Sequence, residues 1–515
     1  MTHERVLFHG GRIYANGLIS ANHDATAICV ENDRIVWVGL DADAPQAHTH
    51  VDLNGLLVTP GFVDAHVHAT STGLVMTGLD LSGARDATEL LTLLTQFTSS
   101  QPEGVILGHG WDDSTWAQPR LPSRSEIDSA APGRAVYLSR IDVHSALVSS
   151  RLVDLAPSTQ SCEGFHAEGP LSREAHHCVR DVALGRVDAT QRRTAQRAFL
   201  THAAALGVVS VHEMAGPTIS TEGDLADLMS LASEGVTPLV TGYWGELATE
   251  GGLEKARDLG AIGAAGDLFI DGSLGSRTAC LHDVYADDIA TTGAAYLTSQ
   301  QISDHVVACT QSGLQAGFHV IGDAACSRVT QGFRDAARVL GAGAVRHARH
   351  RIEHAEMLSI EDIESLSDLN VAASMQPMFD ALWGGDQGMY AARLGSARSG
   401  SMNRLASLRE AGARVMLGSD APVTALGPWL AVRAAVKHQT PRESLDLDSA
   451  FFAHTSAAWY GAGIDDAGPL SPKFMAHFAI WDASGIDDLL DQGCPETVAT
   501  VVSGRLIRDT GLASP

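Results

Sequence analysis

The sequence is poor in basic residues. Its 35 lysines and arginines stand against 61 aspartates and glutamates, which gives a formal net charge of −26 at pH 7. Nucleic acids and anionic membrane surfaces are bound by clustered basic side chains, and these are outnumbered here. We therefore expect no nucleic-acid partner and no membrane partner. A small-molecule substrate is expected instead, and homo-oligomerisation is left open.

Long apolar runs and paired cysteines are also missing. The start, Met1-Thr2-His3-Glu4-Arg5, leads into an alternating segment rather than the apolar stretch of a signal peptide, and no run is long enough to span a bilayer. The seven cysteines are scattered without a Cys-x-x-Cys pair, which disfavours a disulfide framework and a thiolate zinc site. We expect a cytoplasmic protein whose cysteines are small buried side chains.

Two closely spaced histidines end an apolar stretch near the N-terminus. The run Gly61-Phe62-Val63-Asp64-Ala65-His66-Val67-His68 has the β-branched and aromatic residues of a buried strand. Side chains repeat with period two along a strand, so His66 and His68 project from the same face. Imidazole nitrogens suit zinc and similar divalent ions. Because the motif is short, two solvated loop histidines are the alternative.

The two ends of the chain carry matching short strands. Residues 5–57 alternate brief apolar segments with Gly, Asn and Asp turn residues, which predicts an antiparallel meander. Such a meander buries one face only and needs a partner sheet, which the segments at 476–481 and 498–507 can supply. We therefore expect a small β-sandwich built from residues 1–57 and 470–515.

The middle of the chain alternates short apolar runs with Ala-rich helical segments. With the strand that ends at His66, there are eight such runs, which predicts an α/β fold with a (β/α)8 barrel over residues 58–469. Residues from about 70 to 192 form an irregular segment too long for a loop, so we expect an inserted subdomain there. The other seven predicted strands lie at 207–213, 237–243, 268–271, 315–321, 350–355, 371–376 and 414–420.

Potential metal ligands stand at the ends of four predicted strands. Barrels of this class carry their chemistry at the carboxyl ends of the strands, so these side chains should converge. A single histidine on an apolar strand is usually a buried core residue, but this set favours a metal site. The ligands are His66 and His68 after the first strand, His319 in the fifth, His354 in the sixth and Asp420 after the eighth.

With these motifs, the sequence resembles the amidohydrolase superfamily, and within it the family that includes YtcJ-like and N-substituted formamide deformylase-like enzymes. The resemblance covers nearly the whole chain. It is carried by the runs at 59–68, Gly110-Trp111-Asp112, 271–279, His319 with Ile321-Gly322-Asp323, 351–354 and 418–423. It implies a β-sandwich beside the barrel and metal-dependent hydrolysis of an amide or other C–N bond. It also implies that His66, His68, His319, His354 and Asp420 are the ligands, with Asp420 as proton shuttle.

One position departs from the family pattern. Many members carry a lysine four residues before the Asp-Gly of the fourth strand, and its carbamate bridges two metals; Asp267 stands there in this chain. The shorter aspartate should bridge two ions only if the backbone moves inward. We therefore expect one tightly bound ion, zinc, with Asp267 as a ligand or as a carboxylate that orients a histidine. The alternative is a buried aspartate paired with an arginine or backbone donors.

The expected mechanism assigns catalytic roles to three of these residues. A divalent ion activates water and polarises a carbonyl, while Asp420 takes the proton and passes it to the leaving nitrogen. His319 or His354 could instead act as an electrophile toward the carbonyl oxygen, and spacing does not separate these roles. A lyase or isomerase on the same scaffold, or a metal-binding protein without catalysis, stays open as an alternative.

Four further residues are candidates for substrate binding. Trp111, Asp112 and His144 come from the insertion and could form a lid over the pocket, although Trp111 could equally be core packing. Arg277 lies in the glycine-rich segment 271–279 and could clamp a substrate carboxylate. A structural salt bridge is the alternative for Arg277.

Overall fold

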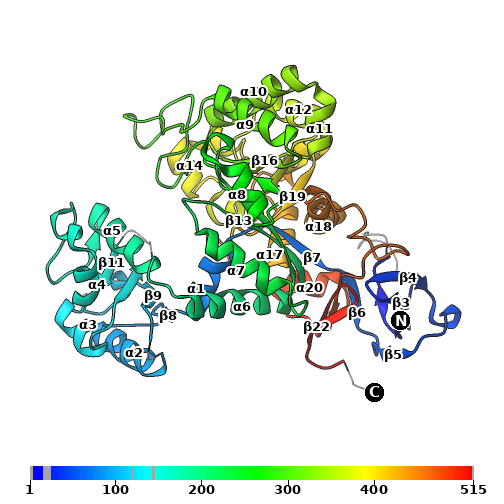
Figure 1. Cartoon of the computed structure of the whole chain (residues 1–515), viewed down its shortest axis with the longest axis horizontal. Coiled ribbons are helices and arrows are strands. Elements are labelled where there is room, and N and C mark those ends of the chain that lie inside the picture. The colour runs from blue at the N-terminus through cyan, green and yellow to red at the C-terminus, as the bar shows by residue number, and fades with distance from the viewer. Residues whose placement is uncertain (1–3, 16–24, 102, 119, 142–144, 513–515) are drawn as a thin grey trace. The chain divides into compact units, whose positions relative to one another are not determined.

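The computed structural model describes residues 4–15, 25–101, 103–118, 120–141 and 145–512. The chain divides into two compact units, one made of Met1–His68 with Leu200–Pro515 and the other of Ala69–Phe199. Each unit is described by itself below, and Figure 1 labels their elements. Within the described ranges, no helix combines the length and apolar character needed to cross a membrane.

The first unit contains a parallel eight-stranded sheet that follows chain order from its first strand to its last. An isolated bridge joins Val67, at the end of the first strand, to Ala421, just beyond the last. The predicted α/β fold with an eight-stranded parallel barrel is confirmed. Its strands are β7 (Phe62–Val67), β13 (Val208–Ala215), β14 (Leu239–Trp244), β15 (Gly263–Ala264), β16 (Gln315–Val320), β17 (Arg351–His354), β18 (Ala372–Met375) and β19 (Val415–Leu417).

The fourth strand is not where the sequence predicted it. The apolar run at 268–271 was expected to form it, but the parallel ladder lies earlier, at β15. Gly266 has φ of 97°, a conformation that favours glycine, and it turns the chain after the strand. Only Phe269 then bridges back to His319. Asp267 therefore stands at a turn and not within a regular strand.

Helices surround the barrel strands in the first unit (Figure 1). Capping boxes at Thr221, Thr298 and Ser359 begin α7, α9 and α12, because each side chain satisfies a free backbone N–H of the first turn. The helices are α7 (Glu222–Ala232), α8 (Gly252–Asp258), α9 (Ser299–Gln311), α10 (Asp323–Leu340), α11 (Ala342–Ala348), α12 (Ile360–Asp368), α13 (Pro377–Trp383), α14 (Met389–Leu394), α15 (Ser396–Ser399), α16 (Leu405–Glu410), α17 (Pro428–Val436), α18 (Leu447–Ala453), α19 (Ser456–Gly461) and α20 (Ile486–Gln492).

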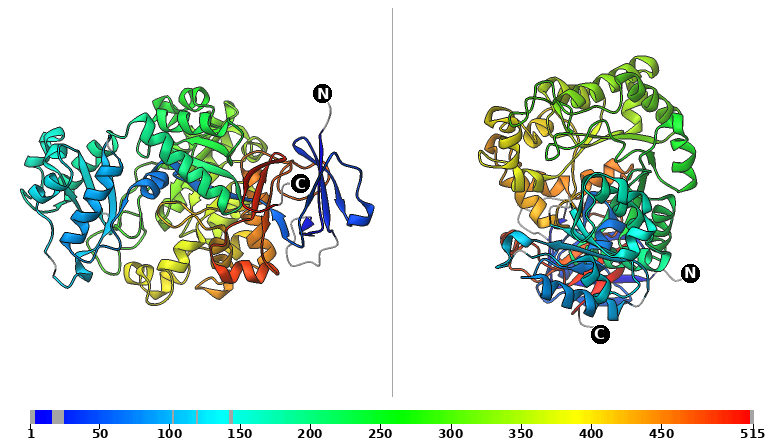
Figure 2. Two further views of the ribbon diagram at one scale, coloured as in Figure 1. Left: turned by 90° about the horizontal axis from the view of Figure 1, so that it is seen from below. Right: turned by 90° about the vertical axis from the view of Figure 1, so that its left-hand side faces the viewer.

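The two ends of the chain meet in a β module of the same unit, where Figure 2 shows early and late strands side by side. One sheet has the order β4-β3-β1-β5 and the other the order β2-β6-β20-β21-β22. The rings of Phe8 and Phe478 pack edge to face between them at 5.2 Å. The strands are β1 (Arg5–His9), β2 (Arg12–Ile13), β3 (Ala27–Glu31), β4 (Arg34–Gly39), β5 (Thr49–Asp52), β6 (Leu57–Pro60), β20 (Phe478–Trp481), β21 (Ala499–Val502) and β22 (Arg505–Asp509).

The second unit, Ala69–Phe199, is a folded α/β body. A five-stranded sheet of order β12-β11-β10-β9-β8 has its own apolar clusters. The domain limits expected from the sequence stay a prediction. The elements are α1 (Ala69–Thr77), β8 (Leu79–Asp80), α2 (Ala87–Ser100), β9 (Ile106–Trp111), α3 (Arg124–Ala130), β10 (Val136–Arg140), β11 (Ser145–Val148), α4 (Ser150–Leu155), β12 (Leu171–Ser172) and α5 (Arg173–Leu184), with α6 (Ala189–Ala205) running into the first unit.

Candidate metal centre

The carboxylate of Asp267 lies among four histidines. Its Oδ2 is 3.1 Å from Nε2 of His68 and 3.5 Å from Nε2 of His66. Its Oδ1 is 3.5 Å from Nδ1 of His319 and 3.6 Å from Nε2 of His354. Each oxygen thus faces one pair of imidazoles. The backbone turns at Gly266, directly before this aspartate.

Asp420 completes the first of these two sets. Its Oδ1 is 3.4 Å from Nε2 of His66 and 3.1 Å from Nε2 of His68. A tetrahedral zinc ion at about 2.0–2.1 Å from its ligands requires ligand atoms about 3.3 Å apart. The four distances that join His66 and His68 to Asp267 and Asp420 lie between 3.1 and 3.5 Å. Among the described residues, His66, His68 and Asp420 lie close enough together to share one ion, and so do His66, Asp267 and His354. The nitrogen–oxygen distances thus suit a zinc site.

Three of the histidines are held in a defined tautomer by an acceptor behind the ring. A carboxylate, an amide oxygen and a carbonyl can only accept, so the ring nitrogen that faces each of them carries the proton. In the neutral ring, which is the form that binds a metal, the other nitrogen carries the lone pair and faces Asp267. The acceptors are Glu353 for His66 Nδ1 at 2.9 Å, Gln376 Oε1 for His354 Nδ1 at 2.8 Å and the carbonyl of Gly272 for His319 Nε2 at 3.2 Å.

Several of the inward-facing atoms have no hydrogen-bond partner of acceptable geometry among the described residues. They are His66 Nε2, Asp267 Oδ1, His319 Nδ1 and Asp420 Oδ1. Buried polar atoms are nearly always satisfied in folded proteins, because leaving one unpaired is costly. A divalent cation accepts lone pairs from nitrogen and oxygen atoms of this kind. The donor set therefore fits a metal ion.

Burial and charge act in opposite directions on the two aspartates. Burial alone would raise the pKa of Asp420, but the adjacent His66 and His68 lower it well below its ordinary value. Burial would also raise the pKa of Asp267, but neighbouring imidazoles in their protonated form, His66 first and then His319 and His354, lower it well below its ordinary value. Both groups are thus carboxylate anions, the form that binds a cation.

A buried ion pair stands behind His66. Nη2 of Arg351 lies 2.9 Å from Oε2 of Glu353, and Nη1 of Arg351 lies 3.1 Å from Nδ1 of His212. The guanidinium also stacks over the ring of Tyr243 at 4.5 Å. Burial would raise the pKa of Glu353, but Arg351 and His66 lower it to about 2. This pair fixes the acceptor that orients a ligand.

The backbone at two candidate ligands has an uncommon conformation. His354 has φ of 68° and Asp420 has φ of 54°, both in the left-handed region that residues other than glycine rarely adopt. Asp64 stabilises the turn at Asp420, because its Oδ1 accepts from the backbone N–H of Ser419 at 2.9 Å and of His66 at 3.2 Å. Such strained residues cluster at functional sites.

A further buried carboxyl lies beyond β17. Glu356 is 3% exposed and follows His354 by two residues. Burial raises the pKa of Glu356 to about 7, and the hydroxyl of Tyr390 and the charge of His319 oppose this rise. No role for Glu356, Glu353 or Gln376 was predicted from the sequence. Two charged residues, at 351 and 353 of a buried strand, could have indicated a functional ion pair, whereas the neutral Gln376 offered no such signal.

Three of the four predicted substrate-binding residues lie among the described residues. Arg277 makes a two-pronged ion pair with Asp287 at 3.1 and 2.8 Å, which fits the salt-bridge alternative. Trp111 is 1% exposed and donates to the carbonyl of Leu138 at 2.9 Å, as core packing would require. Asp112 accepts from Arg140 at 2.8 Å. His144 lies outside the described residues. Substrate binding by these residues stays a prediction.

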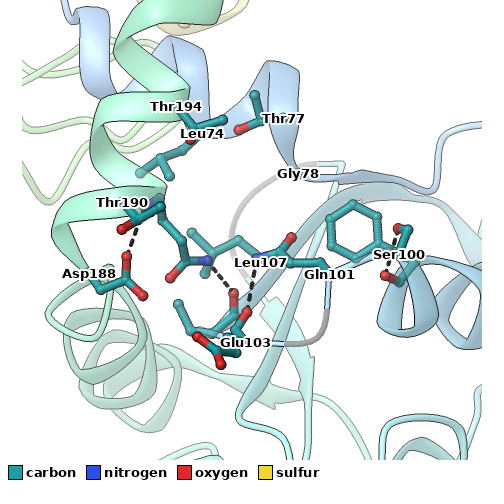
Figure 3. Close-up of a pocket in the computed structure, with 13 residues that line it drawn as sticks. Leu74, Thr77, Gly78, Ser100, Gln101, Glu103, Leu107, Asp188, Thr190 and Thr194 are labelled. Carbon is teal, nitrogen blue, oxygen red and sulfur yellow. Dashed lines mark hydrogen bonds between the residues drawn. The ribbon is translucent and has the colours of Figure 1, made fainter.

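The second unit contains a pocket that the sequence did not predict (Figure 3). Its volume is about 390 Å³, and Glu103 and Asp188 are among the residues that line it, together with Gln101, Thr77 and Thr190. No candidate metal ligand lines it.

A parallel barrel with histidines and carboxylates at its strand ends defines a class, the metal-dependent hydrolases. A model described as "Amidohydrolase family" matches residues 49–508. The chain therefore belongs to the amidohydrolase family, as its motifs predicted.

Three similar proteins support this assignment. Protein LONG AFTER FAR-RED 3 of Arabidopsis thaliana is 30% identical over 525 residues, which cover 93% of this chain and 88% of that protein. N-substituted formamide deformylase of Arthrobacter pascens is 23% identical, with 90% of this chain and 91% of that protein covered. The crystal structure of an uncharacterized metal-dependent hydrolase from Pyrococcus furiosus has a TM-score of 0.78 and 26% identity, and it covers 94% of this chain and 100% of that chain.

Proposed function

We propose that the protein hydrolyses an amide-type carbon–nitrogen bond, linear or cyclic, of a small molecule in a metal-dependent reaction. The observation that carries this proposal is the Asp267 carboxylate, whose two oxygens face two pairs of imidazoles. Family membership supports hydrolysis. The name of one relative, N-substituted formamide deformylase, describes a reaction at an amide group and supports that bond class.

The metal we propose is zinc, with one ion bound tightly. His66, His68 and Asp420 offer two nitrogens and one oxygen that can share one ion, a donor set that suits zinc. Asp267 Oδ2 lies 3.1 Å from His68 Nε2 and 3.5 Å from His66 Nε2 and is the further candidate ligand. The second set consists of Asp267 Oδ1 with His319 and His354, and it offers only three donors. Fewer donors hold an ion less strongly, so occupancy of this set should depend on the metal concentration. When bound, a divalent ion lowers the pKa of water toward neutrality and polarises a carbonyl.

Asp420 is the proposed proton shuttle. Its carboxylate is ionised and lies 3.1 Å from His68 Nε2, so it can accept a proton from an attacking water held at this cluster. It can then pass the proton to the leaving nitrogen, which must be protonated before it departs as an amine. The buried turn that Asp64 stabilises keeps this carboxylate in place.

The tautomers of His319 and His354 favour a ligand role over an electrophilic role. The ring proton of His319 is donated to Gly272, and that of His354 is donated to Gln376. When these rings are neutral, the nitrogens that face Asp267 carry lone pairs, and a lone pair cannot donate a hydrogen bond to a substrate carbonyl. Both rings are consequently suited to hold a cation.

Reaction in labelled water tests the proposal. Protein purified without chelator is assayed for metal content and then screened against N-acyl, N-formyl and cyclic amides in water enriched in oxygen-18. The expected product is an acid that carries one label and an amine. A lyase or isomerase would give an unlabelled product, and a chain that holds well under one metal per molecule would contradict the metal-dependent mechanism.

A further inference from the structure

Four buried polar atoms beside the candidate metal centre find no partner of acceptable geometry among the described residues. All four belong to side chains in the segments that follow β17 and β18, and each of these side chains is at most 4% exposed. Folded proteins leave few such atoms unpaired, so a group of them calls for a ligand or water. The atoms are Glu356 Oε2, Gln376 Nε2, Tyr390 Oη and Asn403 Nδ2.

Glu356 is the charged member of this group and is held firmly. Its carbonyl accepts from the backbone N–H of Asn403 at 2.8 Å, and the next residue, Met357, donates to the carbonyl of Ile321 at 3.1 Å. His319 and Asp420 are close enough for their charges to act on its carboxyl. The carboxyl therefore has a fixed place near the predicted ligands and does not reach solvent.

The surroundings of Glu356 are apolar and aromatic. Met357, Phe379, Tyr390 and Met402 belong to one buried cluster. The ring of Phe379 lies parallel to that of His354, with 5.9 Å between centroids and 10° between planes. The Tyr390 hydroxyl acts on the Glu356 carboxyl, but no described residue donates to Oε2 with acceptable geometry. An apolar side chain would fill this place more favourably than such a carboxyl. Packing therefore does not account for Glu356.

We propose that Glu356 is a specificity-determining residue that accepts a hydrogen bond from a protonated amino group of the substrate. This inference rests on the proposed amide hydrolysis and names its substrate class, which is an amide that carries a second, cationic nitrogen on an apolar body. The apolar body packs against the Phe379 cluster, and the hydroxyl of Tyr390 provides a second polar contact. A buried carboxylate suits this ligand because an ammonium group supplies both the missing charge and the missing donors.

Matched substrate pairs test the inference. The two amides of a pair have the same chain of two to six carbons, which ends in an ammonium group in one and in a methyl group in the other. Values of kcat and KM are measured for both amides. The kcat/KM of wild type should be about 10- to 100-fold higher for the ammonium substrate, because a hydrogen bond between charged groups stabilises a complex by about that factor. Glu356→Gln should lose this preference, with the larger fall in kcat/KM on the ammonium member of each pair. A preference that survives in Glu356→Gln would overturn the inference.

Glu443→Gln is the matched control. Glu443 is also buried in the first unit, but both of its oxygens are used, because they accept from Ser407 Oγ at 2.9 Å and from its backbone N–H at 3.0 Å. This variant should keep the preference for ammonium substrates and lose stability. Glu356→Met should instead raise the melting temperature by a few degrees, because it removes an unpaired buried group. A lowered melting temperature in Glu356→Met would indicate a structural role and would also overturn the inference.

A binding measurement separates this inference from the proposed function. Cyclohexylammonium and cyclohexanol are titrated into wild type and Glu356→Gln by calorimetry, with and without bound zinc. Tighter binding of the ammonium by wild type, lost in Glu356→Gln, supports the subsite even if no amide is hydrolysed, in which case only the proposed reaction fails. Equal binding of both compounds by an enzyme that hydrolyses amides would overturn the subsite alone.

Discussion

Oε2 of Glu353 lies 2.9 Å from Nδ1 of His66, and both side chains are completely buried inside the barrel. The acceptor fixes the ring so that Nε2 faces Asp267 and Asp420. Arg351 in turn neutralises Glu353, so the orientation of a candidate ligand depends on an ion pair on the opposite strand β17. Ligand geometry and barrel stability are therefore coupled.

The first prediction concerns this ion pair. Glu353→Leu should lower the free energy of unfolding by about 3–5 kcal/mol, because it leaves Arg351 charged and unpaired. The double variant Glu353→Leu with Arg351→Met should recover part of this loss, since neither charge then remains buried. Urea unfolding followed by circular dichroism provides the four values of a double-mutant cycle. A double variant as unstable as the sum of the two single variants would exclude the coupling.

The second prediction concerns Asp267. Asp267→Asn should weaken zinc binding by about 10- to 100-fold or more, as loss of a ligand or of its orienting group does. Added bicarbonate should not change activity, because no lysine occupies this position and no carbamate is needed. Chelator competition gives the affinity. Asp362→Asn is the control, since Asp362 is buried on α12 with Thr330 at 2.6 Å as its partner. Equal zinc affinity in both variants would remove Asp267 from the site.

The third prediction concerns Asp420. Asp420→Asn should keep the fold and lower kcat by about 10²–10⁴, as removal of a proton-transfer group typically does. Thermal melting checks the fold, and turnover on the substrate found by screening gives kcat. An active Asp420→Asn enzyme with turnover near that of wild type would contradict the proton-shuttle role.

The predicted parts of the site are those with a local signature. His66 and His68 follow period two along an apolar run, and Asp420 follows the last apolar run of the barrel pattern, so strand alternation alone brought them to one end. The barrel itself was predictable for the same reason, because eight apolar runs alternate with helical segments.

The parts that could not be predicted depend on contacts between distant residues or on single torsions. Glu353 orients a histidine that lies 287 positions away, which no local pattern reveals. The fourth strand ends early because Gly266 adopts φ of 97°, a choice that the sequence permits but does not specify. Arg277 had two candidate roles, and the position of Asp287 in the folded loop decides its observed ion pair.

The last prediction concerns acid stability and two buried histidines that brace the barrel. His305 accepts from the backbone N–H of Ala248 at 3.0 Å through Nδ1 and donates to the carbonyl of Ala264 in β15 through Nε2 at 2.8 Å, so its ring is neutral. His350 accepts from the backbone N–H of Ala316 in β16 at 2.9 Å. Burial lowers the pKa of His305 to about 4 and that of His350 to about 3.

Both shifts make stability fall as pH falls. In the unfolded chain both histidines have a pKa of about 6.5, so above pH 6.5 neither the folded nor the unfolded state binds these protons. Below that pH the unfolded chain binds them and the folded barrel does not. The free energy of unfolding therefore falls from about pH 6.5 downward. Each histidine contributes a slope of up to about 1.4 kcal/mol per pH unit. Urea midpoints between pH 7.5 and 5, above the range where most carboxylates titrate, should decline. His305→Gln should flatten this decline while lowering stability at pH 7.5, whereas the exposed His347→Gln should change neither. A decline that is unchanged in His305→Gln would show that other groups cause the acid lability.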